Sequence, residues 1–213
     1  MPTTLAPKSA VLTRVLERAS QLRTYSFDAT IHYETTDGGG GLAIGGSGAA
    51  DVAADLTEWK LTQSAAKPHL SNSGSLTFSK EPVAESMILT SERVYDRLGG
   101  SPPVAHDWCW RNPKKRPGPQ LSPTDTLAML AKSGRTVSEI GTTIVRGVST
   151  THYAVSGASR ALPVDIWVDS TDQLRRIELT QTGTTYVQTT TTDLFDFDLP
   201  VTIKVPITAP ACP

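Results

Sequence analysis

A strict two-residue alternation of apolar and polar side chains runs through residues 25–33. This period indicates a strand with one buried face and one exposed face. In the preceding residues, 9–22, the apolar side chains recur at helical spacing, which predicts an amphipathic helix that covers an apolar surface. A helix followed at once by a half-buried strand favours a mixed fold in which helices pack against a sheet.

The rest of the chain carries further strand signals, which are short segments of β-branched and aromatic residues bounded by turn residues. The glycine run at 38–41 predicts a turn, and 67–68 and 71–74 have the composition of loops. Residues 91–92 and 169–172 are expected to form hairpin turns. We expect strands at 59–61, 76–78, 87–90, 93–98, 108–111, 137–145, 151–155, 164–168, 174–179 and 184–194.

A second helix is predicted from Ser122 to Gly134. Ser122 caps its N-terminus, Pro123 suits the first helical position, and Asp125 complements the free amides of the first turn. Two helices and a long antiparallel meander predict an α+β fold, with one domain spanning residues 1–213. Within this domain we expect a flexible N-terminus at 1–8, a long loop at 99–121 and an extended tail at 207–213.

The composition argues against two classes of protein and leaves the compartment open. A formal net charge of -1 gives no electrostatic reason to expect nucleic-acid binding. No stretch approaches the roughly 20 apolar residues of a membrane-spanning helix. The N-terminus has no basic segment, apolar segment or cleavage site of a signal peptide. The residues are therefore compatible with a cytoplasmic protein and with a mature exported domain.

No catalytic constellation can be assembled from the sequence. His106 and Asp107 are adjacent, but no activated nucleophile can be named beside them, so we interpret them as a polar pair in a loop. There is no phosphate-binding glycine motif and no nucleophile elbow. We therefore expect a protein that is not an enzyme and needs no cofactor. Metal-site spacing is also missing among His32, His69, His106 and His152.

Cys109 and Cys212 lie too far apart in the sequence for a redox or zinc motif. In an exported protein they can form a disulfide that ties the tail to residues 108–110, and otherwise they are two free buried thiols. The basic run at 114–116 either contacts anionic lipid headgroups or belongs to a solvated loop. Four tryptophans either line a ligand cavity or pack in the core and at its rim; they are Trp59, Trp108, Trp110 and Trp167.

The second half of the chain carries several motifs in order. Residues 122–130 resemble the helix P-x-x-L-L-x-x-L, and 141–153 resemble the strand pair G-x-x-x-V-x-G-V-x-T-x-H-Y. Residues 162–177 resemble the hairpin L-P-V-x-V-W-V-D … L-x-R, and 196–206 resemble D-F-G-x-P-V-x-V-x-x-P. These are motifs of the actinobacterial LppX/LprG-like envelope lipoproteins, which have a LolA-like fold. The lipobox cysteine of that family is absent, and Asp198 stands where the family often has a small residue.

The resemblance implies a strongly curved antiparallel sheet, a half-barrel, wrapped around helices with an apolar cavity between them. Members of the family bind and move acylated lipids, so the expected partner is an acyl lipid or another hydrophobic small molecule. The protein is expected to act in the cell envelope, outside the cytoplasm. It is expected to be a monomer, and further possible partners are the membrane surface and an envelope protein. The alternative is a regulatory envelope module of the same fold that binds or restrains a signalling partner.

Alternation along the helices and strands indicates which side chains would line such a cavity. Burial of an acyl chain there would be favourable by about 0.8 kcal/mol per methylene group. The same side chains would equally suit an ordinary core. The expected lining residues are Leu12, Val15, Leu16, Ala19, Phe27, Ile31, Trp59, Leu61, Phe78, Met87, Leu89, Met129 and Leu130.

Overall fold

The computed structural model of the protein describes residues 10–36, 41–61, 67–70, 76–79, 84–98, 108–112, 126–127, 130, 135–156 and 163–212. Its helix is α1 (Ala10–Ser20), and Thr126, Leu127 and Leu130 are also helical. The strands are β1 (Thr24–Thr35), β2 (Gly41–Asp51), β3 (Leu56–Leu61), β4 (Lys67–Leu70), β5 (Leu76–Ser79), β6 (Ala84–Leu89), β7 (Val94–Leu98), β8 (Trp108–Arg111), β9 (Thr136–Val145), β10 (Val148–Ser156), β11 (Val164–Asp169), β12 (Leu174–Thr182) and β13 (Tyr186–Phe195).

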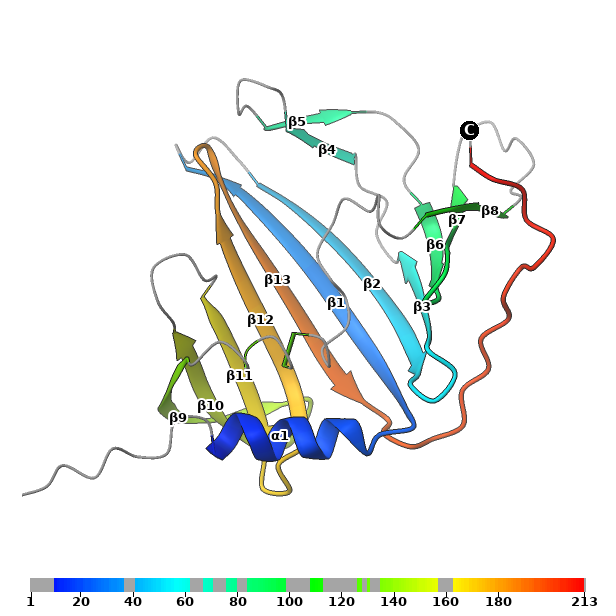
Figure 1. Ribbon diagram of the computed structural model, residues 1–213. Coiled ribbons are helices and arrows are strands. Elements are labelled where there is room, and N and C mark those ends of the chain that lie inside the picture. The colour runs from blue at the N-terminus through cyan, green and yellow to red at the C-terminus, as the bar shows by residue number, and fades with distance from the viewer. Residues whose placement is uncertain are drawn as a thin grey trace, which may run out of the picture. The chain divides into compact units, whose positions relative to one another are not determined.

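Eleven of the described strands form one antiparallel sheet, and β4 and β5 form a separate two-stranded sheet (Figure 1). The order in the large sheet is β8-β7-β6-β3-β2-β1-β13-β12-β11-β10-β9. The chain divides into two compact units. Unit 1 comprises Met1–Leu22, Pro119–Gln181 and Thr189–Leu194, and unit 2 comprises Arg23–Gly118, Thr182–Gln188 and Phe195–Pro213.

In unit 1, the apolar stripe of α1 is buried, as the helical spacing of residues 9–22 predicted. Leu12, Val15 and Ala19 are at most 6% exposed. On the polar side of the helix, Arg14 binds Asp172 in the turn between β11 and β12, with 3.0 Å between Nε and Oδ2. Figure 1 shows α1 next to this turn. The helix is thus held to unit 1 by apolar burial and by an exposed ion pair.

The turn between β11 and β12 is organised by the buried carboxylate of Asp169. This group accepts hydrogen bonds from the backbone N–H and the hydroxyl of Thr171, from the backbone N–H of Gln173 and from Nε of Arg175. Burial raises the pKa of Asp169, but these hydrogen bonds outweigh it and hold the pKa below its ordinary value. The hairpin turn predicted at 169–172 is confirmed.

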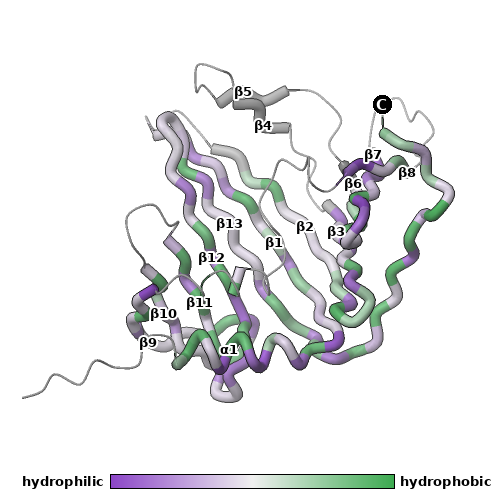
Figure 2. Tube along the Cα trace, viewed as in Figure 1, coloured by the Kyte–Doolittle hydropathy of each residue, from purple (hydrophilic) through white to green (hydrophobic). Residues whose placement is uncertain are grey.

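In unit 2, β1 shows the predicted alternation. Tyr25, Phe27, Ala29 and Ile31 are buried, and the residues between them are more exposed. Figure 2 shows apolar and polar residues following one another along this strand. The predicted hairpin of β6 and β7 is also present, and its turn is closed by the hydroxyl of Thr90, which accepts the backbone N–H of Arg93 at 2.9 Å.

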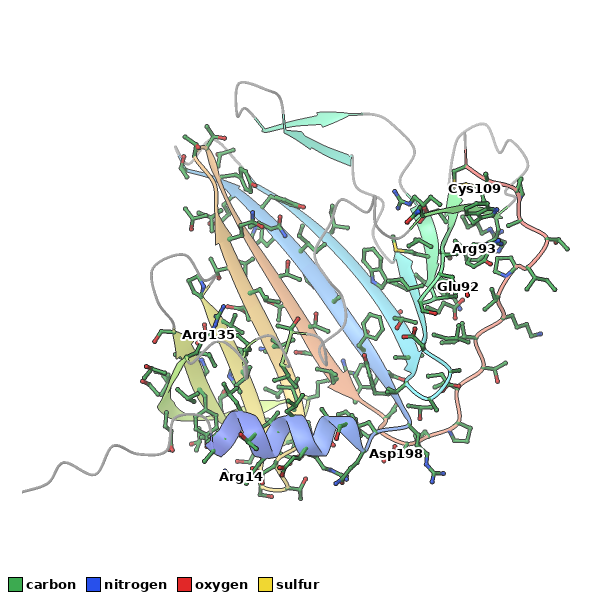
Figure 3. All side chains as sticks on the ribbon, in the orientation of Figure 1. Arg14, Glu92, Arg93, Cys109, Arg135 and Asp198 are labelled. Carbon is green, nitrogen blue, oxygen red and sulfur yellow. A yellow bond between two sulfur atoms is a disulfide. The ribbon has the colours of Figure 1, made fainter. Side chains whose placement is uncertain are left out.

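The C-terminal tail of unit 2 connects the start of β1 with β8. At its beginning, the carboxylate of Asp198 accepts the backbone N–H of Arg23 at 2.9 Å, and the hydroxyl of Thr24 donates to the carbonyl oxygen of Leu199 at 2.6 Å. At its end, Trp110 donates its backbone N–H to Pro210, and its carbonyl accepts the N–H of Cys212. Figure 3 labels Asp198 and Cys109 at the two places where this tail is held.

Some expectations differ from the structure. Residues 67–68, interpreted as a loop, belong to β4. The glycine-rich residues 41–51, which carry only weak strand signals, form a strand of eleven residues. Both ends of the predicted second helix, the N-terminus at 1–8 and most of the loop at 99–121 lie outside the described residues. The antiparallel sheet is present, whereas the predicted single domain stays a prediction.

Candidate functional site

Unit 2 has one sheet face on which the strand register aligns residues predicted to bind a ligand. Phe27 is paired with Gly48, Gly48 with Trp59, and Trp59 with Met87. Directly paired residues point to the same side of a sheet, so these positions form one row. We refer to this side of unit 2 as the Trp59 face. It includes Tyr25, Phe27, Ala29, Ile31, Ile44, Gly46, Gly48, Ala50, Thr57, Trp59, Met87, Leu89, Val94, Asp96, Cys109 and Arg111.

Most of the apolar side chains on the Trp59 face are covered. Phe27 is 1% exposed, Trp59 6% and Ile31 7%, whereas Met87 and Leu89 are half-buried. The aromatic side chains of the face are therefore buried at β1 and β3. Part of its aliphatic surface is accessible to solvent at β6.

The glycines of β2 make room for the aromatic residues of the neighbouring strands. A Cβ atom at Gly48 would lie 2.5 Å from Cζ of Phe27. A Cβ atom at Gly46 would lie 2.6 Å from the carbonyl oxygen of Lys60 and closer still to Nε1 of Trp59. Real Cβ atoms do not approach other atoms so closely, because such overlap is strongly repulsive. Only glycine at these two positions lets the indole and the phenyl ring lie against the backbone of β2.

The indole of Trp59 is a polar group in this apolar setting. Its Nε1 atom is buried, and within the described part of the chain it has no hydrogen-bond partner. An N–H group buried without an acceptor costs about 1–3 kcal/mol. A phenyl ring in the same place would avoid that cost but would fill less of the space over β2.

The Trp59 face becomes polar towards β8. Beyond Met87, the same row continues to Asp96 and then to Cys109. Asp96 is 4% exposed and binds Arg111, with 2.6 Å between Oδ2 and Nε. Cys109 forms a disulfide with Cys212, which is one of the two states that the sequence left open. The row thus runs from a phenyl ring at one end to an ion pair and a disulfide at the other.

The remaining predicted lining residues are distributed over both units. Leu12, Val15 and Ala19 are buried on α1 in unit 1, Leu16 on the same helix is half-buried, and Leu130 is fully buried. Leu61 is paired with Gly46 in β3, and Phe78 is paired with Pro68 in the separate sheet of β4 and β5. Met129 lies outside the described residues. Whether these side chains line a cavity stays a prediction.

A second cluster, on one face of unit 1, was not predicted. The register pairs His152 with Trp167 and Trp167 with Arg176. The imidazole stacks on the indole with 4.3 Å between ring centroids, and its Nε2 lies 2.7 Å from Oδ1 of Asp165. On the other side of the indole, Cζ of Arg176 lies 5.6 Å from the ring centroid. A continuous stack of imidazole, indole and guanidinium therefore crosses three strands.

Arg176 extends this cluster to β13 through a two-point ion pair with Asp193. The distances are 2.5 Å from Nε to Oδ1 and 2.8 Å from Nη2 to Oδ2. The hydrogen bond to Asp193 raises the pKa of Arg176, so its guanidinium stays charged. The sequence did contain a signal for this cluster, because His152, Trp167 and Arg176 each fall within a motif of the second half of the chain.

Among the described residues, no group of three or more His, Cys, Asp or Glu side chains is arranged to hold a metal ion. Nor does the described part of the chain contain a helix long and apolar enough to cross a membrane.

Comparisons with known proteins identify the fold. No protein-family model matches the sequence, and no curated protein matches it either. Among solved structures, LprF from Mycobacterium bovis superposes with a TM-score of 0.55 at 11% identity, over 93% of this chain and 96% of that one. The lipoprotein LppX from Mycobacterium tuberculosis gives a TM-score of 0.49 at 14% identity, over 92% of this chain and 98% of that one.

A LolA superfamily protein from Nitrosomonas europaea also matches, with a TM-score of 0.35 at 11% identity, over 92% of this chain and 96% of that one. The superposition on LprF carries the assignment, because it covers nearly all of both chains. At this level of identity the likeness concerns the fold and not the activity. The chain therefore has a fold similar to that of LprF.

Proposed function

We propose that this protein is not an enzyme and that it binds a hydrophobic ligand, an acyl lipid, on the Trp59 face. The observation that carries the proposal is the row from Phe27 through Gly48 and Trp59 to Met87, which is apolar across four strands and ends at the half-buried side chain of Met87. Half-buried Met87 and Leu89 are the places where a ligand first reaches this surface. The likeness in fold to LprF supports the proposal.

The finer features of the proposal concern the shape of the site and its location. We infer that the strands of unit 2 curve around the ligand. The protein acts in the cell envelope, where it carries the lipid between membranes or presents it to a partner. No chemical step is required, because each buried methylene group stabilises the complex by about 0.8 kcal/mol.

The experiment is native mass spectrometry of the purified protein, combined with organic extraction and lipid analysis. We expect a co-purified acyl lipid in a one-to-one complex, or uptake of added palmitic acid by the lipid-free protein. A lipid-free protein that takes up no added lipid, and instead captures a protein partner in stable form, would favour the regulatory alternative.

A pair of variants makes this experiment specific to the Trp59 face. Met87→Glu places a charge on the half-buried part of that face and should abolish lipid uptake while the circular dichroism spectrum stays unchanged. Ile144→Glu is the matched control, because Ile144 is 72% exposed on β9 in unit 1, and it should bind lipid normally. Equal uptake by both variants would contradict the location of the site.

A further inference from the structure

The indole N–H of Trp59 is the feature of the Trp59 face that ordinary packing does not explain. Trp59 is only 6% exposed, and its Nε1 atom has no acceptor within the described part of the chain. Further along the same face, Asp96 and Arg111 are held by an ion pair with 2.6 Å between Oδ2 and Nε. Trp59 has no such charge to compensate it.

The position of the N–H group connects it to the surface where the ligand is proposed to lie. Nε1 lies against Gly46, in the space that a Cβ atom would occupy on this face of β2. A ligand on the face reaches Nε1 by replacing the groups that now cover it. For an alkyl chain this exchange leaves the N–H unpaired, whereas a carbonyl oxygen accepts it and removes the cost of an orphaned donor.

The polarity along the row suits a ligand with a carbonyl in the middle. On one side of Trp59 lie Gly48 and Phe27, which have no polar side-chain atoms. On the other side the row passes Met87 and reaches the Asp96–Arg111 pair. An acyl lipid has the same order of groups, with a hydrocarbon chain, then an ester or amide carbonyl, then a polar head.

We propose that Trp59 determines specificity on this face, and that it donates a hydrogen bond to the carbonyl by which the acyl chain of the ligand is attached. The inference rests on the proposed function. It adds that the protein binds lipids with an acyl carbonyl more tightly than lipids whose chains carry no carbonyl. The acyl chain lies over β1 and β2, and the polar head lies towards β7 and β8.

The test uses two lipids that differ only in the carbonyl, dipalmitoylglycerol with two ester links and dihexadecylglycerol with two ether links. Binding of each to the purified, delipidated protein is measured by native mass spectrometry in competition. We expect the wild-type protein to prefer the ester by about tenfold, the value of one hydrogen bond to a buried donor. In Trp59→Phe, which keeps an aromatic ring but has no donor, the preference should fall to within about twofold of unity.

Trp110→Phe is the matched control, because Trp110 is paired with Tyr95 on the opposite side of the same sheet and should leave the preference unchanged. Equal binding of both lipids by the wild type, or a preference retained in Trp59→Phe, would overturn the inference while leaving the proposed function intact. Failure of the wild type to bind either lipid would contradict both.

A second measurement works without any variant. In the wild-type protein labelled with 15N at tryptophan, the indole proton of Trp59 should move downfield when dipalmitoylglycerol binds, because a new hydrogen bond deshields it. Dihexadecylglycerol should leave that proton near its starting position. Identical shifts with the two lipids would refute the hydrogen bond.

Discussion

The strands of unit 2 pack through glycines and aromatic rings, whereas those of unit 1 are joined across one face by ion pairs and stacked polar rings. In unit 2, Gly46 and Gly48 leave the room that Trp59 and Phe27 occupy. In unit 1, the corresponding cross-strand interactions come from the His152 stack and the ion pair of Arg176 with its carboxylate partner. These particular cross-strand contacts therefore depend on steric fit in unit 2 and on charge and ring stacking in unit 1.

The ends of the two units differ as well. In unit 2, the edge strand β8 is paired with the tail through Trp110 and is cross-linked by the disulfide. In unit 1, β9 is the last strand in the order and carries Ile140 and Ile144, which are 60% and 72% exposed. Contacts that depend on steric fit are sensitive to side-chain volume, and a disulfide is sensitive to reduction. Ion pairs are sensitive to pH and salt concentration. This difference can be tested variant by variant.

The largest effect is expected from removal of the disulfide in unit 2. The bond joins residues 103 positions apart, and closing a loop of that length stabilises a fold by about 4–5 kcal/mol. Cys109→Ser combined with Cys212→Ser should therefore lower the free energy of unfolding by that amount in urea titrations. Reductant should destabilise the wild type equally and leave the double variant unchanged. If the reduced wild type is as stable as the oxidised protein, the tail does not contribute in this way.

The next largest effect is expected from filling the space over β2. Gly46→Val puts side-chain atoms where the indole of Trp59 lies and should cost about 2–3 kcal/mol of unfolding free energy. The indole should be displaced, so the tryptophan emission shifts to longer wavelength. Ala43→Val is the control, because Ala43 is exposed on the same strand and should change stability by less than about 0.5 kcal/mol. Similar effects at both positions would argue against the steric explanation.

A smaller effect is expected when the ion pair of unit 1 is broken. Asp193→Asn keeps the size of the side chain but removes the charge that faces Arg176, and it should cost about 1–2 kcal/mol. Because both groups are partly accessible, the wild-type advantage should shrink as salt is raised. Chemical unfolding at low and high salt measures both quantities. A variant as stable as the wild type at low salt would show that the pair adds nothing.

The pH dependence of unit 1 should come in part from Asp169, whose pKa is held below its ordinary value of 3.8. A carboxyl group with a lowered pKa in the folded state stabilises the protein above its unfolded pKa. This contribution is lost as pH falls through the folded pKa. Stability should therefore decline below about pH 4. Asp169→Asn should be less stable at neutral pH and should decline less on acidification; parallel curves for the two proteins would refute this.

Local patterns in the sequence predicted several elements of this fold. The alternation at 25–33 predicted β1, the helical spacing at 9–22 predicted α1, and the polar residues at 169–172 predicted a turn. Each of these signals is contained within a single helix, strand or turn, so no distant contact is needed to read it. The glycine-rich β2 gave only a weak signal, because glycine has a low intrinsic preference for strands.

The candidate site was predictable as a set of apolar residues but not as a surface. Alternation predicted that Phe27, Trp59 and Met87 face the interior; the register aligns them in one row, in which Met87 is half-buried. The row of His152, Trp167 and Arg176 could not be anticipated in the same way, since it depends on which residues of three strands lie opposite one another. A shift of the register by one residue would reverse these faces.

Periodicity and turn chemistry are local properties, so they could be read from the order of residues alone. Register, the fit of an indole against Gly46, the unpaired N–H of Trp59 and the pairing of Arg176 with its carboxylate arise only when distant segments meet. These contacts were decided by the tertiary structure, because each depends on atoms brought within a few ångströms by packing and not by their separation along the chain.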